Sequence, residues 1–181
     1  MSLKEFLQGT WLGHPLHPAL VHVPTGLWVS ALVFDLLTVL GVESNALVRS
    51  SFYALAAGLV VALLAAPAGL ADWWDIKREK PAWTLGLWHM ILNITITLLA
   101  AVNVYFRLGP ALQAEKVETG PLLLSVLMVG LLLVSGYLGG RMVYNYGTSV
   151  ARQSKQEWRE RAEAGGARLP AQSAPAQGKK S

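Results

Sequence analysis

Four stretches of about 20 mostly apolar residues constrain this chain more than any other feature. They cover residues 19–40, 52–71, 85–106 and 121–142, and polar turns separate them. A helix needs roughly 20 such residues to cross a bilayer, and a bilayer offers no water to the backbone of loops or open strands. Only 14% of the residues are charged, against about 25% in a soluble domain. We therefore expect an all-α fold, an integral membrane four-helix bundle over residues 13–147.

The segments that flank this bundle differ from it in composition. Residues 1–12 form a short amphipathic lead-in that could lie along the bilayer surface. Residues 148–164 can form a charged helix outside the membrane. Residues 165–181 are rich in Ala, Pro, Gln and Ser, which predicts a disordered cytoplasmic tail. No strong internal repeat is visible in the sequence.

The distribution of basic residues predicts the topology. An even number of spans places the N-terminus, the loop 72–84 and the C-terminal tail on one side. That side carries twelve Lys and Arg residues, whereas the other carries only Arg49, Arg107 and Lys116. The positive-inside rule then places both termini in the cytoplasm. Because the basic residues lie in loops and the tail, with no nucleic-acid-binding motif around them, we expect no nucleic-acid partner.

The segment GHPLHPALVHVP, residues 13–24, is the place where chemistry is expected. It holds His14, His17 and His22, three of the four histidines in the chain, interleaved with prolines. A residue before proline is disfavoured in the α region, so we expect His14 and His17 to lie outside regular helix. An imidazole can bind a metal, haem iron or a proton near neutral pH.

Several polar residues are expected to converge on the cytoplasmic face of the bundle. His22 begins the first span, and His89 lies about five residues into the third, which enters from the same side. Asp72 follows the second span, and Arg141 lies at the end of the fourth. Up-and-down helices could place His22 and His89 opposite each other across the core.

Asp35 is the one acidic residue deep inside an apolar span. An ionisable side chain at that depth is costly and usually has a partner or a function. A structural role, with a hydrogen bond to Asn103 near the same depth, and a role in a proton or ion path are both open.

Four motifs give the chain a family resemblance. The segments GHPLHPALVHVPTGLW, ADWWDI, WHMILN and GYLGGRMVYNYG resemble a bacterial family of four-span membrane proteins, the domain of unknown function 2231. Some relatives look joined to Rieske or cytochrome c-like domains, which implies a redox association in a bacterial inner membrane. In many relatives the closing motif reads His-Gly where this chain has Tyr146–Gly147. If that histidine is a ligand in the family, the resemblance implies that this chain has lost it or uses another residue.

A haem site is the first of two cofactor hypotheses. A b-type haem needs two axial histidines, and His22 and His89 fit by depth. Lys77, Arg78 or Arg141 could meet the propionates, while Gly26 and Gly86 could give the macrocycle room. The chain has no cysteine, which excludes thiolate ligation, covalent attachment through Cys and iron–sulfur clusters. No histidine lies at the outer end, so at most one haem is expected.

A transition metal ion is the second hypothesis, with His14, His17, His22 and His89 as ligands and Asp72 as a further candidate. Two classes without a cofactor stay open: an ion or proton transport subunit, and a membrane scaffold. No hydrolase or nucleotide-binding motif is present, so no enzyme activity is assigned beyond electron transfer. The expected partners are the lipid bilayer and a redox partner protein.

Overall fold

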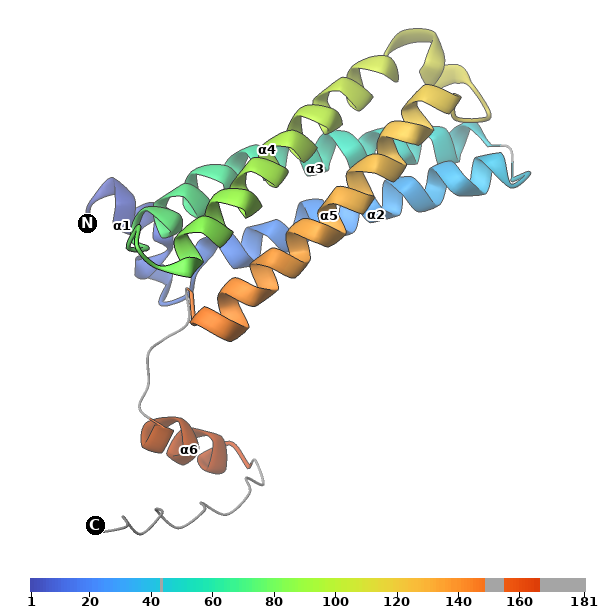
Figure 1. The fold of residues 1–181 in the computed structure, drawn as a ribbon. Coiled ribbons are helices and arrows are strands. Elements are labelled where there is room, and N and C mark those ends of the chain that lie inside the picture. The colour runs from blue at the N-terminus through green and yellow to red at the C-terminus, as the bar shows by residue number, and fades with distance from the viewer. Residues whose placement is uncertain (43, 149–154, 167–181) are drawn as a thin grey trace, which may run out of the picture. The chain divides into compact units, whose positions relative to one another are not determined.

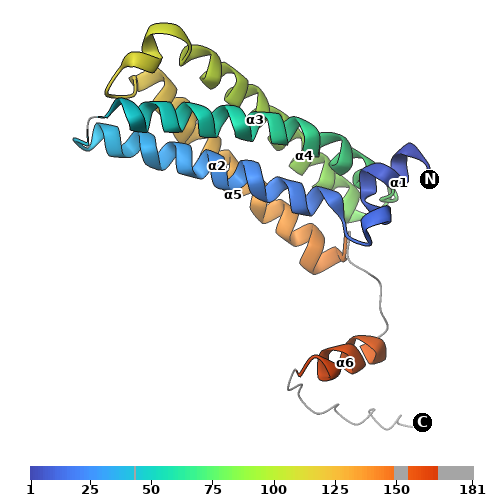
Figure 2. The same ribbon diagram turned by 180° about the vertical axis from the view of Figure 1, so that it is seen from behind.

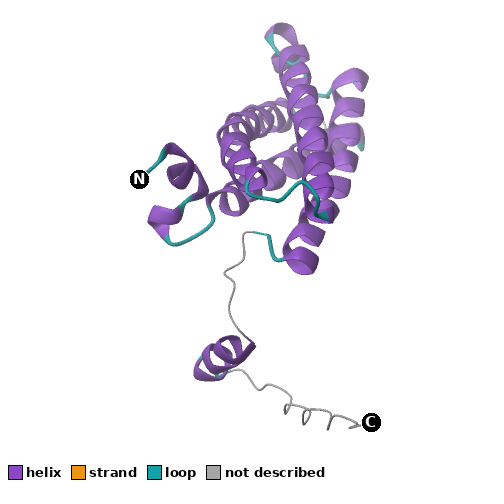
Figure 3. Cartoon of the chain, turned by 60° about the vertical axis from the view of Figure 1, so that its left-hand side comes forward, coloured by secondary structure: helices purple, strands orange, loops and turns teal. Residues whose placement is uncertain are grey.

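The computed structural model describes residues 1–42, 44–148 and 155–166, and every element in these ranges is helical (Figure 3). The described elements are α1 (Leu3–Gln8), the 3₁₀ helix η1 (Thr10–Leu12), α2 (Leu16–Val39), α3 (Asn45–Trp74), α4 (Pro81–Phe106), the 3₁₀ helix η2 (Gly109–Gln113), α5 (Thr119–Tyr146) and α6 (Lys155–Ala164). Helices α2, α3, α4 and α5 are long and apolar enough to cross a membrane. The predicted all-α bundle with four membrane helices is confirmed.

The four long helices form two hairpins that pack on each other (Figures 1 and 2). Helices α2 and α3 make the first hairpin, and α4 and α5 make the second. The bundle is closed by contacts of α3 with α4 and of α2 with α5. Helices α2 and α4 therefore run parallel and lie diagonally across the core. We call the end with the α2–α3 loop and η2 the loop end, and the opposite end, near α1, the histidine end.

The first membrane helix begins earlier than expected. Helix α2 starts at Leu16, so His17 is helical and only His14 lies before the helix. The expectation for His17 was wrong because Pro18 falls in the first turn, where a backbone N–H has no helical partner to lose. Pro24 lies inside α2. Helix α3 is likewise longer than the predicted span 52–71.

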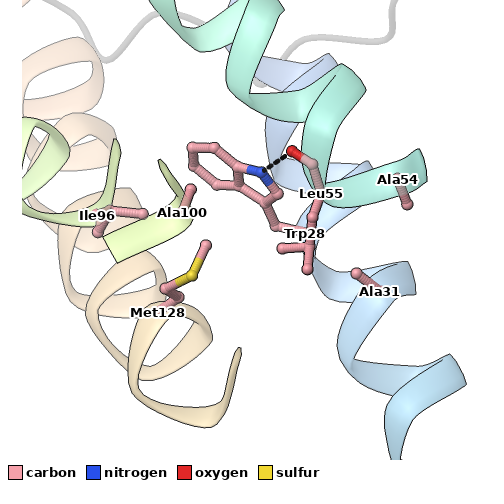
Figure 4. Packing of buried hydrophobic residues seen from close by; sticks show 7 residues of the cluster. All are labelled: Trp28, Ala31, Ala54, Leu55, Ile96, Ala100 and Met128. Atoms are coloured by element: carbon pink, nitrogen blue, oxygen red, sulfur yellow. Dashed lines mark hydrogen bonds between the residues drawn. The ribbon is translucent and has the colours of Figure 1, made fainter. Parts of the chain in front are cut away.

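The centre of the bundle is packed around Trp28. Its indole projects from α2 toward α4, and its Nε1 donates a hydrogen bond of 3.3 Å to the carbonyl of Leu55 (Figure 4). The ring lies against Gly58, where an added Cβ would come within 2.5 Å of Nε1. Around it lie the other buried members of the cluster: Ala31, Ala54, Leu55, Ile96, Ala100 and Met128.

Most apolar surface of the bundle faces outward. Only 17–28% of the most apolar window of each long helix is buried within the protein. The remaining apolar side chains are available to lipid, as expected for spans that pack on each other along one face only.

The N-terminal segment is attached to the histidine end of the bundle. Gln8 of α1 donates hydrogen bonds to the Ala71 carbonyl (3.3 Å) and to the Asp75 carboxylate (2.6 Å), and Lys4 pairs with Asp75. These contacts tie the predicted lead-in, residues 1–12, to the end of α3.

The C-terminal part is a separate unit. Helix α6 covers Lys155–Ala164 of the predicted charged helix 148–164 and carries an ion pair between Arg159 and Glu163. Residues 149–154 and most of the predicted disordered tail, residues 167–181, lie outside the described residues.

Candidate functional site

A buried ion pair joins the two hairpins near the loop end. Asp35 lies in α2, and Arg107 caps the C-terminus of α4. The guanidinium donates one hydrogen bond to each carboxylate oxygen, at 2.8 and 2.6 Å. Their side chains are 0% and 3% exposed, respectively. This two-pronged geometry is the strong form of an Arg–carboxylate contact.

All four long helices contribute to the polar network around this pair. Arg107 also donates to Ser51 of α3 (2.9 Å), to Asn103 of α4 (2.9 Å) and to Ser125 of α5 (3.1 Å). The Ser125 hydroxyl donates to Asp35 (2.9 Å). In the described residues, no buried side-chain nitrogen or oxygen lacks a hydrogen-bond partner. Such a charge-balanced and fully bonded network indicates a structural lock.

Arg107 was expected among the outer loop charges, and its place in the buried network was not predicted. The predicted hydrogen bond from Asp35 to Asn103 is replaced by a shared partner, since Arg107 binds both side chains. One signal was present in the sequence. Arg107 lies four residues after Asn103, which places both on one face of the helix.

At the histidine end, the structure brings two histidines of different hairpins together. His17 lies in the first turn of α2, and His89 lies in α4. Their ring centroids are 6.5 Å apart, and the ring planes are perpendicular. Both rings are half-buried.

Each of these rings is oriented by a carbonyl of its own hairpin. The Nδ1 atom of His17 lies 3.1 Å from the Ala65 carbonyl, and that of His89 lies 2.9 Å from the Ser135 carbonyl. Because a carbonyl oxygen only accepts, Nδ1 carries the proton in both rings. The lone pair of each neutral ring is then on Nε2, the nitrogen left to bind a ligand.

Two glycines lie against the histidine rings. An added Cβ at Gly69 of α3 would come within 2.7 Å of the His17 ring, and one at Gly139 of α5 would come within 3.1 Å of the His89 ring. Close approach of the ring to helix backbone therefore requires glycine at position 69. At position 139 a larger residue would push the ring by a few tenths of an ångström.

Asn93 and Ser135 form a second layer behind His89. The Ser135 hydroxyl lies 3.0 Å from His89 Nδ1. The Asn93 side chain donates to that hydroxyl and to the His89 carbonyl, both at 2.7 Å. Asn93, one turn after His89 on α4, therefore supports His89 both through the His89 backbone carbonyl and through Ser135.

His22 and His14 are separated from this pair. His22 is exposed, and its Nδ1 donates to the Pro18 carbonyl in its own helix. It follows His17 by five residues, which at about 100° per residue turns it to another side of α2. The structure thus places His17, rather than His22, opposite His89.

His14 lies before α2, with Nδ1 at 3.1 Å from the Pro15 carbonyl. Together with Asp72 it borders a shallow depression whose other lining residues are Gln8, Gly9, Thr10, Gly13 and Pro15. In the described part of the chain, no group of three or more His, Asp or Glu side chains has a geometry that could hold a metal ion.

The remaining predicted site residues are two glycines and three basic residues. The indole of Trp73 packs on Gly86 and would lie within 2.5 Å of a Cβ added there, whereas nothing lies within 4 Å of a Cβ added at Gly26. Lys77 and Arg78 are exposed in the loop between α3 and α4. Arg141 is half-buried two residues after Gly139, so its side chain leaves α5 on a different side.

Comparison with known protein families gives one match. Residues 13–152 match a family described as "Predicted membrane protein (DUF2231)". This range begins just before the HPLHP segment and includes both hairpins. No curated protein and no solved structure matches the chain.

Proposed function

The chain belongs to the DUF2231 family of predicted membrane proteins, and we propose that it is a membrane redox protein that holds one b-type haem between His17 and His89. Membership of the family agrees with the resemblance drawn from the sequence motifs. The family description supplies the membrane setting and no activity, so the proposal depends on the geometry of the histidine pair.

The spacing of the two imidazoles is the observation that carries the proposal. A metal-binding imidazole holds its metal about 2.0–2.1 Å from the nitrogen, so its ring centroid lies about 3.2 Å from the metal. Two such rings on opposite sides of one metal therefore have centroids about 6.4 Å apart. The His17 and His89 centroids are separated by 6.5 Å. Perpendicular ring planes suit this arrangement because each ring can turn about its own metal–nitrogen bond.

The surroundings of the rings also suit axial ligands. Metal-binding histidines usually donate the other ring N–H to a carbonyl or carboxylate, which fixes the tautomer, and both rings do so here. The Nε2 atoms make no hydrogen bond. Since the described residues contain no buried side-chain nitrogen or oxygen without a partner, each Nε2 has some exposed surface.

The number of available protein ligands favours haem over a bare metal ion. A structural zinc site needs about four protein ligands, and a catalytic one about three. The described residues bring together two histidines and no group of three metal-binding side chains. A haem supplies four nitrogens from its own macrocycle and needs only two axial histidines. Bound haem would supply one-electron chemistry at the iron.

The roles of the chain's own residues follow from this assignment. His17 and His89 would bind the iron, the Ala65 and Ser135 carbonyls would orient the two rings, and Gly69 would admit the His17 ring close to α3. A carrier of single electrons needs a donor and an acceptor, so a redox partner protein is part of the proposal. Propionate binding by Arg141, Lys77 or Arg78 also stays a prediction.

The location proposed for this activity is a bacterial inner membrane with both termini in the cytoplasm, which places the histidine end at the cytoplasmic face. Twelve basic residues on that side support it, against Arg49 and Lys116 on the other once the buried Arg107 is left out.

Haem content of the purified protein tests the proposal. The full chain is solubilised in mild detergent and assayed for haem as its pyridine complex and for metals by elemental analysis. We expect about one haem per chain and no other metal in comparable amount. A transition metal without porphyrin would support the metal-ion alternative. A protein that takes up neither, even after haem is added, would be better interpreted as a transport subunit or a scaffold.

A further inference from the structure

We infer that the bundle is built from two copies of one helical-hairpin pattern. In two layers between the copies the two facing residues differ, and these differences make each hairpin bind the other hairpin rather than a second copy of itself. The first observation concerns α2 and α4 with its C-cap Arg107. Four of the five buried positions of α2 fall on buried positions when the chain is shifted by 72 residues, and the fifth, Thr38, falls on exposed Pro110. Buried positions 24, 28, 31 and 35 correspond in this way to buried positions 96, 100, 103 and 107: Pro24, Trp28, Ala31 and Asp35 to Ile96, Ala100, Asn103 and Arg107.

All four buried positions of α5 fall on buried positions of α3 with a shift of 70 residues, while four further buried positions of α3 have no buried counterpart. Buried positions 51, 55, 58 and 65 correspond to buried positions 121, 125, 128 and 135: Ser51, Leu55, Gly58 and Ala65 to Pro121, Ser125, Met128 and Ser135. A pattern of burial that repeats over both helices of a hairpin indicates a repeated structure. Residue types differ at every one of these positions.

The histidine contacts repeat with the same shifts. His17 binds the Ala65 carbonyl and lies on Gly69, whereas His89 binds the Ser135 carbonyl and lies on Gly139. The histidines are 72 residues apart, and each carbonyl and glycine is 70 residues from its counterpart. The two hairpins are therefore related by an approximate two-fold axis along the bundle. Equivalent residues of α2 and α4 meet across this axis.

Each pair of equivalent residues of α2 and α4 forms one layer across the axis. In two of these layers the residues differ, and they complement each other in size or in charge. Large Trp28 has small Ala100 as its counterpart, and both belong to one core cluster. The acid Asp35 has the base Arg107 as its counterpart, and these two side chains bind each other. Pairing of two first hairpins would oppose two indoles and two acids, and pairing of two second hairpins would oppose two alanines and two bases. A buried like-charge pair in a bilayer is strongly disfavoured, so these layers select the unlike hairpin.

The pairing of the hairpins does not depend on a cofactor. The inner surface of each hairpin fits a hairpin of the same architecture that carries the opposite charge in one layer and a residue of complementary size in the other. The histidine layer has the same residue on both hairpins. His17 and His89 face each other because the two asymmetric layers determine which hairpins pair.

Transposing the polar layer tests the pairing rule in the full chain. The transposed variant carries Asp35→Arg, Ala31→Asn, Arg107→Asp and Asn103→Ala, which moves the network by the 72-residue shift. Two like-charge variants, Asp35→Arg alone and Arg107→Asp alone, serve as matched controls. The chain has no cysteine, so nitroxide labels can be placed at the exposed equivalent positions Val33→Cys and Tyr105→Cys.

We expect the transposed variant, in lipid nanodiscs, to retain the wild-type distance between the labels and a thermal midpoint well above those of both controls. The controls should show a broadened or lengthened distance. A transposed variant no more stable than the controls would overturn the pairing rule, as would controls that behave like the wild type.

A second measurement tests the repeat itself without touching the core. One label pair is placed at Val33 and Tyr53 in the first hairpin, and the equivalent pair at Tyr105 and Leu123 in the second; all four side chains are exposed. The repeat predicts two distance distributions that coincide within the width of the label. Clearly different mean distances would show that the hairpins are not related by a two-fold axis.

Discussion

Asp35 and Arg107 stand 72 residues apart in the chain, and they form a two-pronged ion pair between diagonally opposite helices of the bundle. Both residues are buried. Arg107 donates to Ser51 of α3 and to Ser125 of α5, and Asp35 accepts from Ser125. Because the pair joins the first hairpin to the second, it holds the hairpins in one register at the loop end. The histidines at the other end are each tied only to their own hairpin.

Removing one partner of this pair should be costly. Arg107→Met leaves the Asp35 carboxylate buried without a counter-charge, and loss of one member of a buried pair typically costs about 3–5 kcal/mol. We expect a large drop in the thermal midpoint in detergent. The thermal midpoint of Arg107→Lys should lie between those of the wild type and Arg107→Met. An ammonium group keeps the positive charge but cannot bond both carboxylate oxygens as the planar guanidinium does.

The matched control replaces both charges at once. In Asp35→Leu combined with Arg107→Met, Ser51 keeps the Ala31 carbonyl and Ser125 keeps Asn103 as partners. Apolar replacement of a whole buried pair is often close to neutral, so the double variant should be more stable than Arg107→Met. A double variant less stable than the single one would contradict this account of the network.

Glycine 69 should be needed for the histidine pair. In Gly69→Ala the new Cβ would lie 2.7 Å from the His17 ring and displace it, whereas in Gly139→Ala the contact with His89 is 3.1 Å. We expect haem affinity to fall by roughly tenfold or more in Gly69→Ala, as for other groups that orient a metal ligand, and by less in Gly139→Ala. Titration with haem measures both. Gly136→Ala, where nothing lies within 4 Å, is the control and should bind normally.

The attachment of α1 should depend on pH. Hydrogen bonds from Lys4 and Gln8 hold the pKa of the Asp75 carboxyl below its usual range. A lowered folded-state pKa means that the contact stabilises fully above the ordinary carboxyl pKa and is lost as the pH falls through the folded value, below about 4. A nitroxide at Leu3→Cys should become more mobile in that window. Adding Asp75→Asn should make the label equally mobile at neutral pH, and a label immobile at all pH values in this variant would disprove the role of Asp75.

The topology expected from the charge bias can be tested with reporter fusions. Alkaline phosphatase fused after Ser44, in the α2–α3 loop, should be active because that loop is expected in the periplasm. The same enzyme fused after Lys155 should be inactive. Phosphatase activity from the second fusion would place the C-terminal part outside and reverse the orientation.

The four membrane helices were predictable because a helix that crosses a bilayer needs a run of about 20 mostly apolar residues. A single polar residue within such a run does not hide it. The histidine pairing was less accessible. Whether His17 or His22 faces His89 depends on where α2 starts, and prolines at 15 and 18 argue for a late start from local preference alone. Tertiary packing instead starts the helix at Leu16, where Pro18 costs no hydrogen bond.

The Asp35–Arg107 pair and the two-fold repeat were hidden for a different reason. Arg107 directly follows an apolar run, where a charge normally marks the membrane surface, and only its place in the bundle shows that it is buried. At the buried core positions the repeat preserves burial while the residue type changes, as in Trp28 against Ala100, whereas the histidines and the glycines they touch are retained. So few retained residues do not reveal the repeat in the sequence.

Reduced-minus-oxidised absorbance of the full chain and three histidine variants is the most direct test of the central claim, that His17 and His89 together hold one haem. The wild type, reconstituted with haem, should show the sharp α band of a bis-histidine b-type haem. His17→Ala and His89→Ala should each lose that band, while His22→Ala, the matched control, should keep it. A wild-type band that survives either His17→Ala or His89→Ala, or disappears in His22→Ala, would contradict the account.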